Sequence, residues 1–205
     1  MSERTRHIVL GLALVALAAG ATTLTLVLTR GGRAAPSRAE AAAPAHGPLS
    51  TSSLRAGFAV LSHKHSNRCG MPASALESMP PGAHLQGSCC FPMDYQSYVN
   101  QVRELSRRYK RVDLIPKDPY DIPLRLAKLL IGYQSIELTP AQQRSYDRAK
   151  PLSETKGPCC CPCWRWDAFE GQAKFLIARR HYSARQIAAI WSAEEGCGGP
   201  SHHSA

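Results

Sequence analysis

The sequence predicts an all-α protein: a compact helical domain of about six helices with Cys-rich loops, after an N-terminal transmembrane helix. Three observations favour this fold. Apolar residues recur at helical spacing along most of the chain, capping residues precede several of these runs, and 21 uncharged residues from Ile8 to Leu28 are long enough to cross a bilayer as a helix. No run predicts a strand, because the apolar pairs around Val112 and Leu114 are short and lie beside prolines.

The chain divides into four parts. Residues 1–30 are expected to form an N-terminal membrane anchor or signal segment, since Arg4 and Arg6 precede the apolar run and small residues follow at 18–21. Residues 31–53, rich in Gly, Ala, Pro and Ser, predict a flexible linker. Residues 54–200 are the expected Cys-rich helical domain, and residues 201–205 are a polar tail.

Six helices are expected in this domain. The first carries Leu54, Phe58 and Leu61 and stops before the polar stretch 63–67. The second follows Asp94, a good N-cap, and runs to about Tyr109. The third is opened by Asp121 and Pro123 and carries the apolar residues 124–131; the fourth runs from the capping box Thr139–Gln142 to about Lys150. The fifth spans Trp164–Arg180, and the sixth runs from the capping box Ser183–Gln186 to Gly196.

The eight cysteines lie in loops or at expected helix starts, at positions 69, 89, 90, 159, 160, 161, 163 and 197. Two of these loops, at 87–93 and 157–163, share the pattern GxCCxPx and precede a helix that ends in two arginines. A duplicated loop-plus-helix unit is one interpretation. Where the second loop has Cys163, the first has Met93, another soft sulfur.

Clustered thiolate and thioether sulfurs favour copper(I), and with histidine added they also suit zinc. The expected cofactor is therefore copper(I) or zinc. The HxHxxxC stretch at 63–69 adds two nitrogens, although histidines at a helix end are also favoured by the helix dipole alone. The candidate metal ligands are Cys89, Cys90, Met93, Cys159, Cys160, Cys161, Cys163, His63, His65 and Cys69.

Two alternatives stay open. A thiol-disulfide or maturation factor would use a thiolate at Cys163 or Cys161, favoured by the helix dipole and by Arg165. A disulfide-stapled interaction domain is also expected of an exported chain with an even number of cysteines, with Cys69 or Cys197 in a structural bridge. Four cysteines within five residues favour a ligand cluster or exchanging thiols over such a framework.

Cys161-Pro162-Cys163, the expected helix after it and the Ser183 cap resemble a layout in two groups of bacterial exported proteins. One is the PCYCGC-motif lipoprotein-like family, and the other is the thiol subunit of the haem-ligation machinery of cytochrome c maturation. The resemblance covers about residues 157–192. This chain lacks the PCYCGC string, has Tyr182 in place of the usual glycine and carries additional cysteines. The whole cysteine pattern is similar to uncharacterised Cys-rich bacterial proteins with an N-terminal anchor, which implies class and compartment but no activity.

The charge distribution and the sequence motifs limit the classes of partner and activity that are expected. The part after Ser53 has 20 Lys and Arg against 13 Asp and Glu, but no basic stripe interleaved with aromatic residues, so nucleic acid is not expected as a partner. The common phosphate-loop, dinucleotide, zincin and serine-hydrolase motifs are absent from the sequence, which favours binding over catalysis. We expect a single-pass cell-membrane protein with an extracytoplasmic C-terminal domain that meets a metal-transfer or thiol-exchange protein.

Overall fold

The computed structural model describes residues 49–199. The expected anchor at 1–30, the linker up to residue 48 and the tail at 201–205 lie outside this range. Within residues 49–199, no helix is long and apolar enough to cross a membrane.

Most of the described chain is helical, as the sequence predicts. Its α-helices are α1 (Thr51–Leu61), α2 (Tyr95–Arg108), α3 (Leu124–Gly132), α4 (Pro140–Leu152), α5 (Trp164–Arg180) and α6 (Ala184–Ala193), with 3-10 turns η1 (Ala73–Ser78) and η2 (Tyr133–Ser135). The N-cap at Asp94 and both predicted capping boxes are present. Helix α1 begins at Thr51, three residues before the expected start of the domain, because Ser50 caps it.

The expectation that the domain contains no strands is wrong. Strands β1 (His84–Gln86) and β2 (Asp121–Pro123) pair antiparallel, with Leu85 opposite Ile122. Residues 121–123 were expected to open the third helix. They are instead extended, as the residue before a proline prefers, and α3 begins one residue after Pro123. Three-residue strands are too short for a period-two pattern to reveal them.

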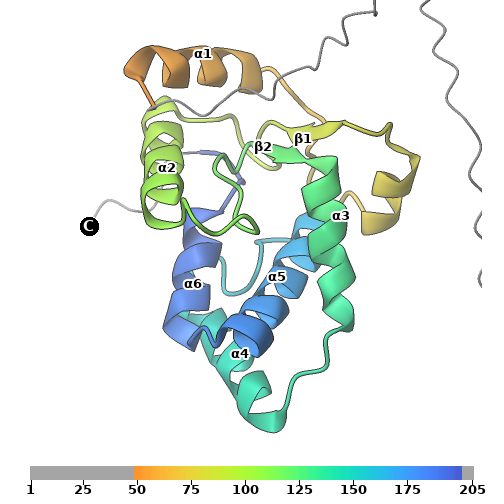
Figure 1. Ribbon diagram of the computed structural model, residues 1–205. Coiled ribbons are helices and arrows are strands. Elements are labelled where there is room, and N and C mark those ends of the chain that lie inside the picture. The colour runs from red at the N-terminus through yellow and green to blue at the C-terminus, as the bar shows by residue number, and fades with distance from the viewer. Residues whose placement is uncertain (1–48, 200–205) are drawn as a thin grey trace, which may run out of the picture. The chain divides into compact units, whose positions relative to one another are not determined.

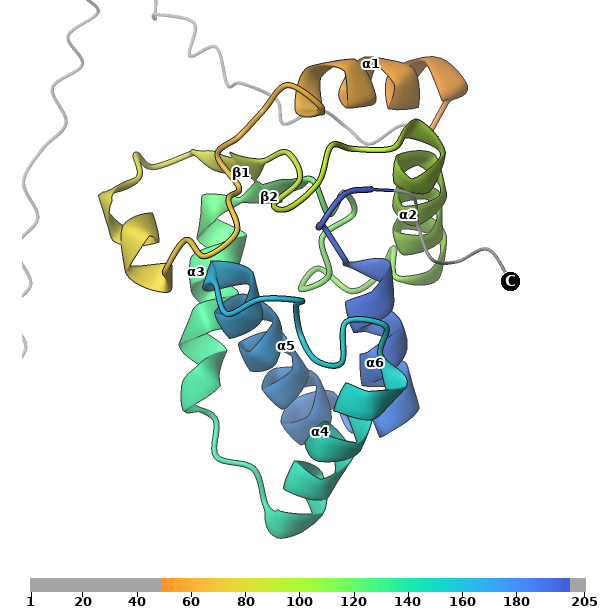
Figure 2. The same ribbon diagram turned by 180° about the vertical axis from the view of Figure 1, so that it is seen from behind.

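Helix α5 is the centre of the main core. It lies between α3 and α6 in both views (Figures 1 and 2), and its Trp164 and Phe169 are almost fully buried. A second apolar cluster joins α1 to α2 through Leu54, Tyr98 and Val102. The chain reaches α5 through an irregular segment after α4, visible in teal in Figure 2. This irregular segment contains half of the cysteines.

Candidate metal centre

The cysteines come from four segments that are distant in sequence. Cys69 lies between α1 and η1, and Cys89 and Cys90 lie between β1 and α2. The group 159–163 precedes α5, and Cys197 follows α6. All eight lie in the described residues and are free thiols.

Backbone hydrogen bonds join three of these segments at the cysteines themselves. The Cys69 N–H donates to the Cys89 carbonyl at 3.1 Å, and the Cys90 N–H donates to the Cys197 carbonyl at 3.1 Å. The Cys89 N–H donates to the carbonyl of Gly196 at 3.0 Å. Loops bound in this way hold their side chains in a fixed arrangement without regular secondary structure.

Asn67 connects the fourth segment to the others. It is almost fully buried, its Nδ2 donates to the Gly87 carbonyl at 2.9 Å, and its Oδ1 accepts from Trp164 Nε1 at 3.1 Å. Trp164 is the first residue of α5, directly after Cys163. A single amide side chain thus links the loop of Cys69, the loop of Cys89 and the start of α5.

The sulfur atoms of these segments lie against one another. Cys160 Sγ is 2.8 Å from Cys197 Sγ and 3.7 Å from Cys90 Sγ. Cys69 Sγ is 2.9 Å from Cys161 Sγ, although 92 residues separate them.

The inner sulfurs continue the same network. Cys89 Sγ is 3.5 Å from Cys90 Sγ, and Cys159 Sγ lies within 4.8 Å of the sulfurs of Cys160 and Cys161. The pKa of Cys159 is in addition influenced by the neighbouring thiols of Cys163, Cys197 and Cys89. All eight sulfurs therefore belong to one connected group, which we call the cysteine cluster. The two GxCCxPx loops meet in it.

The thiols of the cluster differ in acidity. Hydrogen bonds, first of all from Cys163, hold the pKa of Cys159 far below the ordinary thiol value. The hydrogen bond with Cys159 raises the pKa of Cys89 to about 11, and burial raises those of Cys90 and Cys160 to about 11. The pKa values of Cys161 and Cys163 are raised as well. The arrangement favours one thiolate within the hydrogen-bonded pair of Cys159 and Cys163, and the sequence suggested Cys163 or Cys161 for this role.

Arg165 is the charged group next to the cluster. Its side chain is 1% exposed, and its guanidinium donates to the backbone carbonyls of Pro119 at 2.9 Å and Glu194 at 2.7 Å. Among the described residues, no carboxylate forms an ion pair with it. Its positive charge contributes to the lowered pKa of Cys159 and opposes the rise of the Cys89 pKa, so it favours thiolates in the cluster.

Of the ten metal ligands proposed from the sequence, the structure brings some together and leaves others apart. Seven of them are cysteines of the cluster. His63 and His65 are exposed, and the close groups of candidate ligands in residues 49–199 contain cysteines only. Met93 packs against the apolar cluster of α1 and α2, and its backbone forms a bridge with Gly199. Its role as a ligand stays a prediction.

Cys197 is the cluster residue that the sequence-based ligand set omits. It stands alone, 34 residues after Cys163, which suggested a structural bridge rather than a ligand. Glycines surround it at 196, 198 and 199, and two of these have positive φ values of 79° and 81°. Such glycines indicate a tight approach of the chain to another segment, and this was the available signal.

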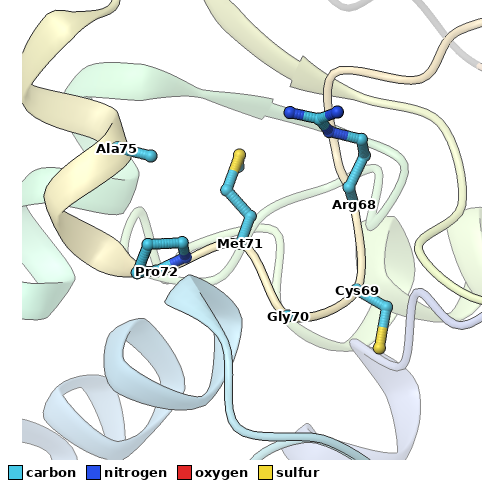
Figure 3. Close-up of a pocket in the computed structure, with 6 residues that line it drawn as sticks. All are labelled: Arg68, Cys69, Gly70, Met71, Pro72 and Ala75. Carbon is cyan, nitrogen blue, oxygen red and sulfur yellow. The ribbon is translucent and has the colours of Figure 1, made fainter.

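A pocket of about 320 Å³ opens beside Cys69 and is lined by residues 68–72 and by Ala75. Figure 3 shows the Cys69 thiol directed away from the Met71 and Arg68 side chains. Cys69, Cys90 and Cys160 are exposed, whereas Cys159, Cys163 and Cys197 are buried. The cluster therefore has a buried side and a side that solvent and other molecules can reach.

Comparisons of the chain with protein-family models, curated proteins and solved structures found no match.

Proposed function

We propose that this protein binds soft metal ions, copper(I) or zinc, through its cysteine cluster and passes them to a partner protein. The observation that carries the proposal is the convergence of eight free thiols from four chain segments. The cluster contains three groups of cysteines, and within each group all the sulfur atoms lie within 4.8 Å of one another. Thiolate sulfur is the ligand type that copper(I) and zinc prefer, and about 2.3 Å is the usual zinc–sulfur distance.

The accessible side of the cluster supports transfer in addition to storage. Exposed Cys69, Cys90 and Cys160 can be reached by a thiol of another protein, so a metal ion can move by stepwise exchange of sulfur ligands. Phe91, which follows Cys90, is 63% exposed and offers an apolar contact beside this side. With the apolar segment 8–28 as a membrane anchor, the domain would do this outside the cytoplasm.

The test uses the full-length chain, purified in detergent, reduced and without chelator. Elemental analysis and competition with chromophoric chelators are expected to find bound copper(I) or zinc. A variant in which Cys159, Cys160, Cys161 and Cys163 are all replaced by serine should lose the binding, since serine hydroxyls are poor ligands for soft metals. His63→Gln with His65→Gln is the control, because both rings are exposed, and it should retain the metal. A chain without metal and without affinity for either ion would overturn the proposal.

Thiol-disulfide exchange is the second candidate. The close sulfur pairs Cys69–Cys161 and Cys160–Cys197 and the lowered pKa of Cys159 favour it. This function predicts a reversible two-electron oxidation of the metal-free chain in a glutathione buffer: two thiols become one disulfide while oxidised glutathione is reduced. Thiol counting under denaturing conditions distinguishes both functions from a disulfide framework, which would leave few titratable thiols without reductant.

A further inference from the structure

The close sulfur groups of the cysteine cluster share members. The first group is Cys89, Cys90, Cys160 and Cys197; the second is Cys69, Cys90 and Cys161; the third is Cys159, Cys160 and Cys161. Sulfurs that bind one ion from about 2.3 Å away lie at most about 4.6 Å apart, so each group has roughly the size of one metal position. Cys90, Cys160 and Cys161 each belong to two groups.

We propose that the cluster holds more than one copper(I) ion, joined into a single polynuclear centre by the shared thiolates of Cys90, Cys160 and Cys161. This inference rests on the proposed function and specifies its ligand. A thiolate has lone pairs for two metal ions, and a sulfur that lies in two groups is placed to use both. Separate single-ion sites would instead require groups without common members.

The number of sulfurs in each group favours copper(I) over zinc. A structural zinc ion takes four protein ligands in a closed tetrahedral site, and two of the three groups offer only three sulfurs. Copper(I) is softer and is stable with two or three thiolates. The histidines that could complete a zinc site lie outside these groups among the described residues.

The charge next to the cluster agrees with such a centre. A polynuclear site with more thiolates than monovalent copper ions carries net negative charge. Arg165 is buried, and among the described residues no carboxylate lies within ion-pair distance of it; the carboxyls of Asp118 and Glu194 act on it only from farther away. A buried charge is costly unless opposite charge close to it compensates it. The anionic metal–thiolate centre supplies that compensation, and Arg165 acts as a positioning residue for it.

Native mass spectrometry of the full-length chain during anaerobic titration with chelator-buffered copper(I) tests the proposal. We expect more than one copper per chain, with little single-copper form, and a copper–copper shell in X-ray absorption. A single copper per chain, or the absence of that shell, would overturn the polynuclear centre but leave the proposed function intact. Binding of zinc alone would also overturn the polynuclear copper centre, whereas a chain that binds no metal would overturn both this centre and the proposed function.

Serine variants test the bridging assignment. Cys90→Ser and Cys69→Ser remove exposed thiols, but only Cys90 is shared between two groups. Cys90→Ser is therefore expected to lose more copper per chain than Cys69→Ser, with circular dichroism checking that both fold. Equal losses would contradict bridging at Cys90.

The number of protons released for each copper ion bound tests the role of Arg165. Proton release during copper(I) loading in weakly buffered solution counts the thiols that lose protons, and this number should exceed the number of copper ions bound if the centre is anionic. In addition, Arg165→Lys should retain copper better than Arg165→Met. An equal number of protons and copper ions would contradict the assigned counter-charge even if the Arg165→Met variant fails to fold.

Discussion

The guanidinium of Arg165 lies directly against the backbone of Gly196, the residue before Cys197. A Cβ atom at position 196 would lie 2.5 Å from Arg165 Cζ, closer than real Cβ atoms come to other heavy atoms. The buried cation and the loop that carries the last cysteine therefore fit together only because residue 196 has no side chain. This contact links the charge of Arg165 to the geometry of the cysteine cluster.

Gly196→Ala is accordingly expected to displace either Arg165 or the Cys197 loop. We expect a loss of about 1–3 kcal/mol in the free energy of unfolding, as in other overpacked sites, together with lower copper uptake. Gly132→Ala is the control, because a Cβ there meets nothing within 4 Å and it closes helix α3. Urea denaturation of the metal-free, reduced chain measures the stability of both variants, and copper(I) titration measures their uptake. Equal stability of the two variants would mean that the loop adapts without cost.

Asn67→Leu should loosen the alignment of three cysteine segments. The change leaves the Trp164 indole N–H and the Gly87 carbonyl without their buried partner, so we expect a loss of about 2 kcal/mol or more. Asn100→Leu, at an exposed position of α2, should change the stability by less than about 0.5 kcal/mol. Denaturation curves compare the variants, and an undiminished stability of Asn67→Leu would show that the loops are held by other contacts.

Met93→Leu tests the thioether. Because the side chain packs against the apolar cluster of α1 and α2, we expect a change in stability below about 1.5 kcal/mol and an unchanged number of copper ions. Parallel titrations with copper(I) and zinc are the measurement. A fall in copper(I) affinity with zinc affinity retained would instead identify Met93 as a ligand.

Glu194 should make stability fall as the pH rises. Burial raises its pKa from about 4.5 to about 8, so the folded state holds this proton more tightly than the unfolded state. The resulting stabilisation is complete below about pH 4.5 and is lost as the pH rises through about 8. The geometry agrees: within the described residues, the buried Glu194 Oε2 has no hydrogen-bond partner that would stabilise a carboxylate charge.

Glu194→Gln removes this ionisation and keeps the shape. We expect it to be more stable than the unmodified chain above pH 8 by an amount on the order of a few kcal/mol, with the advantage shrinking toward pH 4.5. Unfolding free energies at several pH values give the difference curve, and Glu137→Gln, at an exposed site, controls for the change in charge. A pH-independent difference would contradict the raised pKa of Glu194.

The local helix signals were sufficient to place most elements. The Asp94 cap, the two capping boxes and the apolar spacing of α5 each act within about one turn, so the sequence alone determined those helices. The short strands were not predicted, because their pairing depends on residues far along the chain. Leu85 is buried opposite Ile122, 37 residues later.

For the candidate site, the sequence by itself determined the available side-chain chemistry: crowded sulfurs in loops that precede helices. Only the tertiary structure decided which sulfurs meet. It brought Cys197 into the cluster, left His63 and His65 exposed, and placed Arg165 beside the thiols with no ion pair to a carboxylate among the described residues. Composition and spacing report on interactions between residues that are close in sequence. The contact between Cys69 and Cys161 instead depends on long-range hydrogen bonds between loops and on the packing of α5.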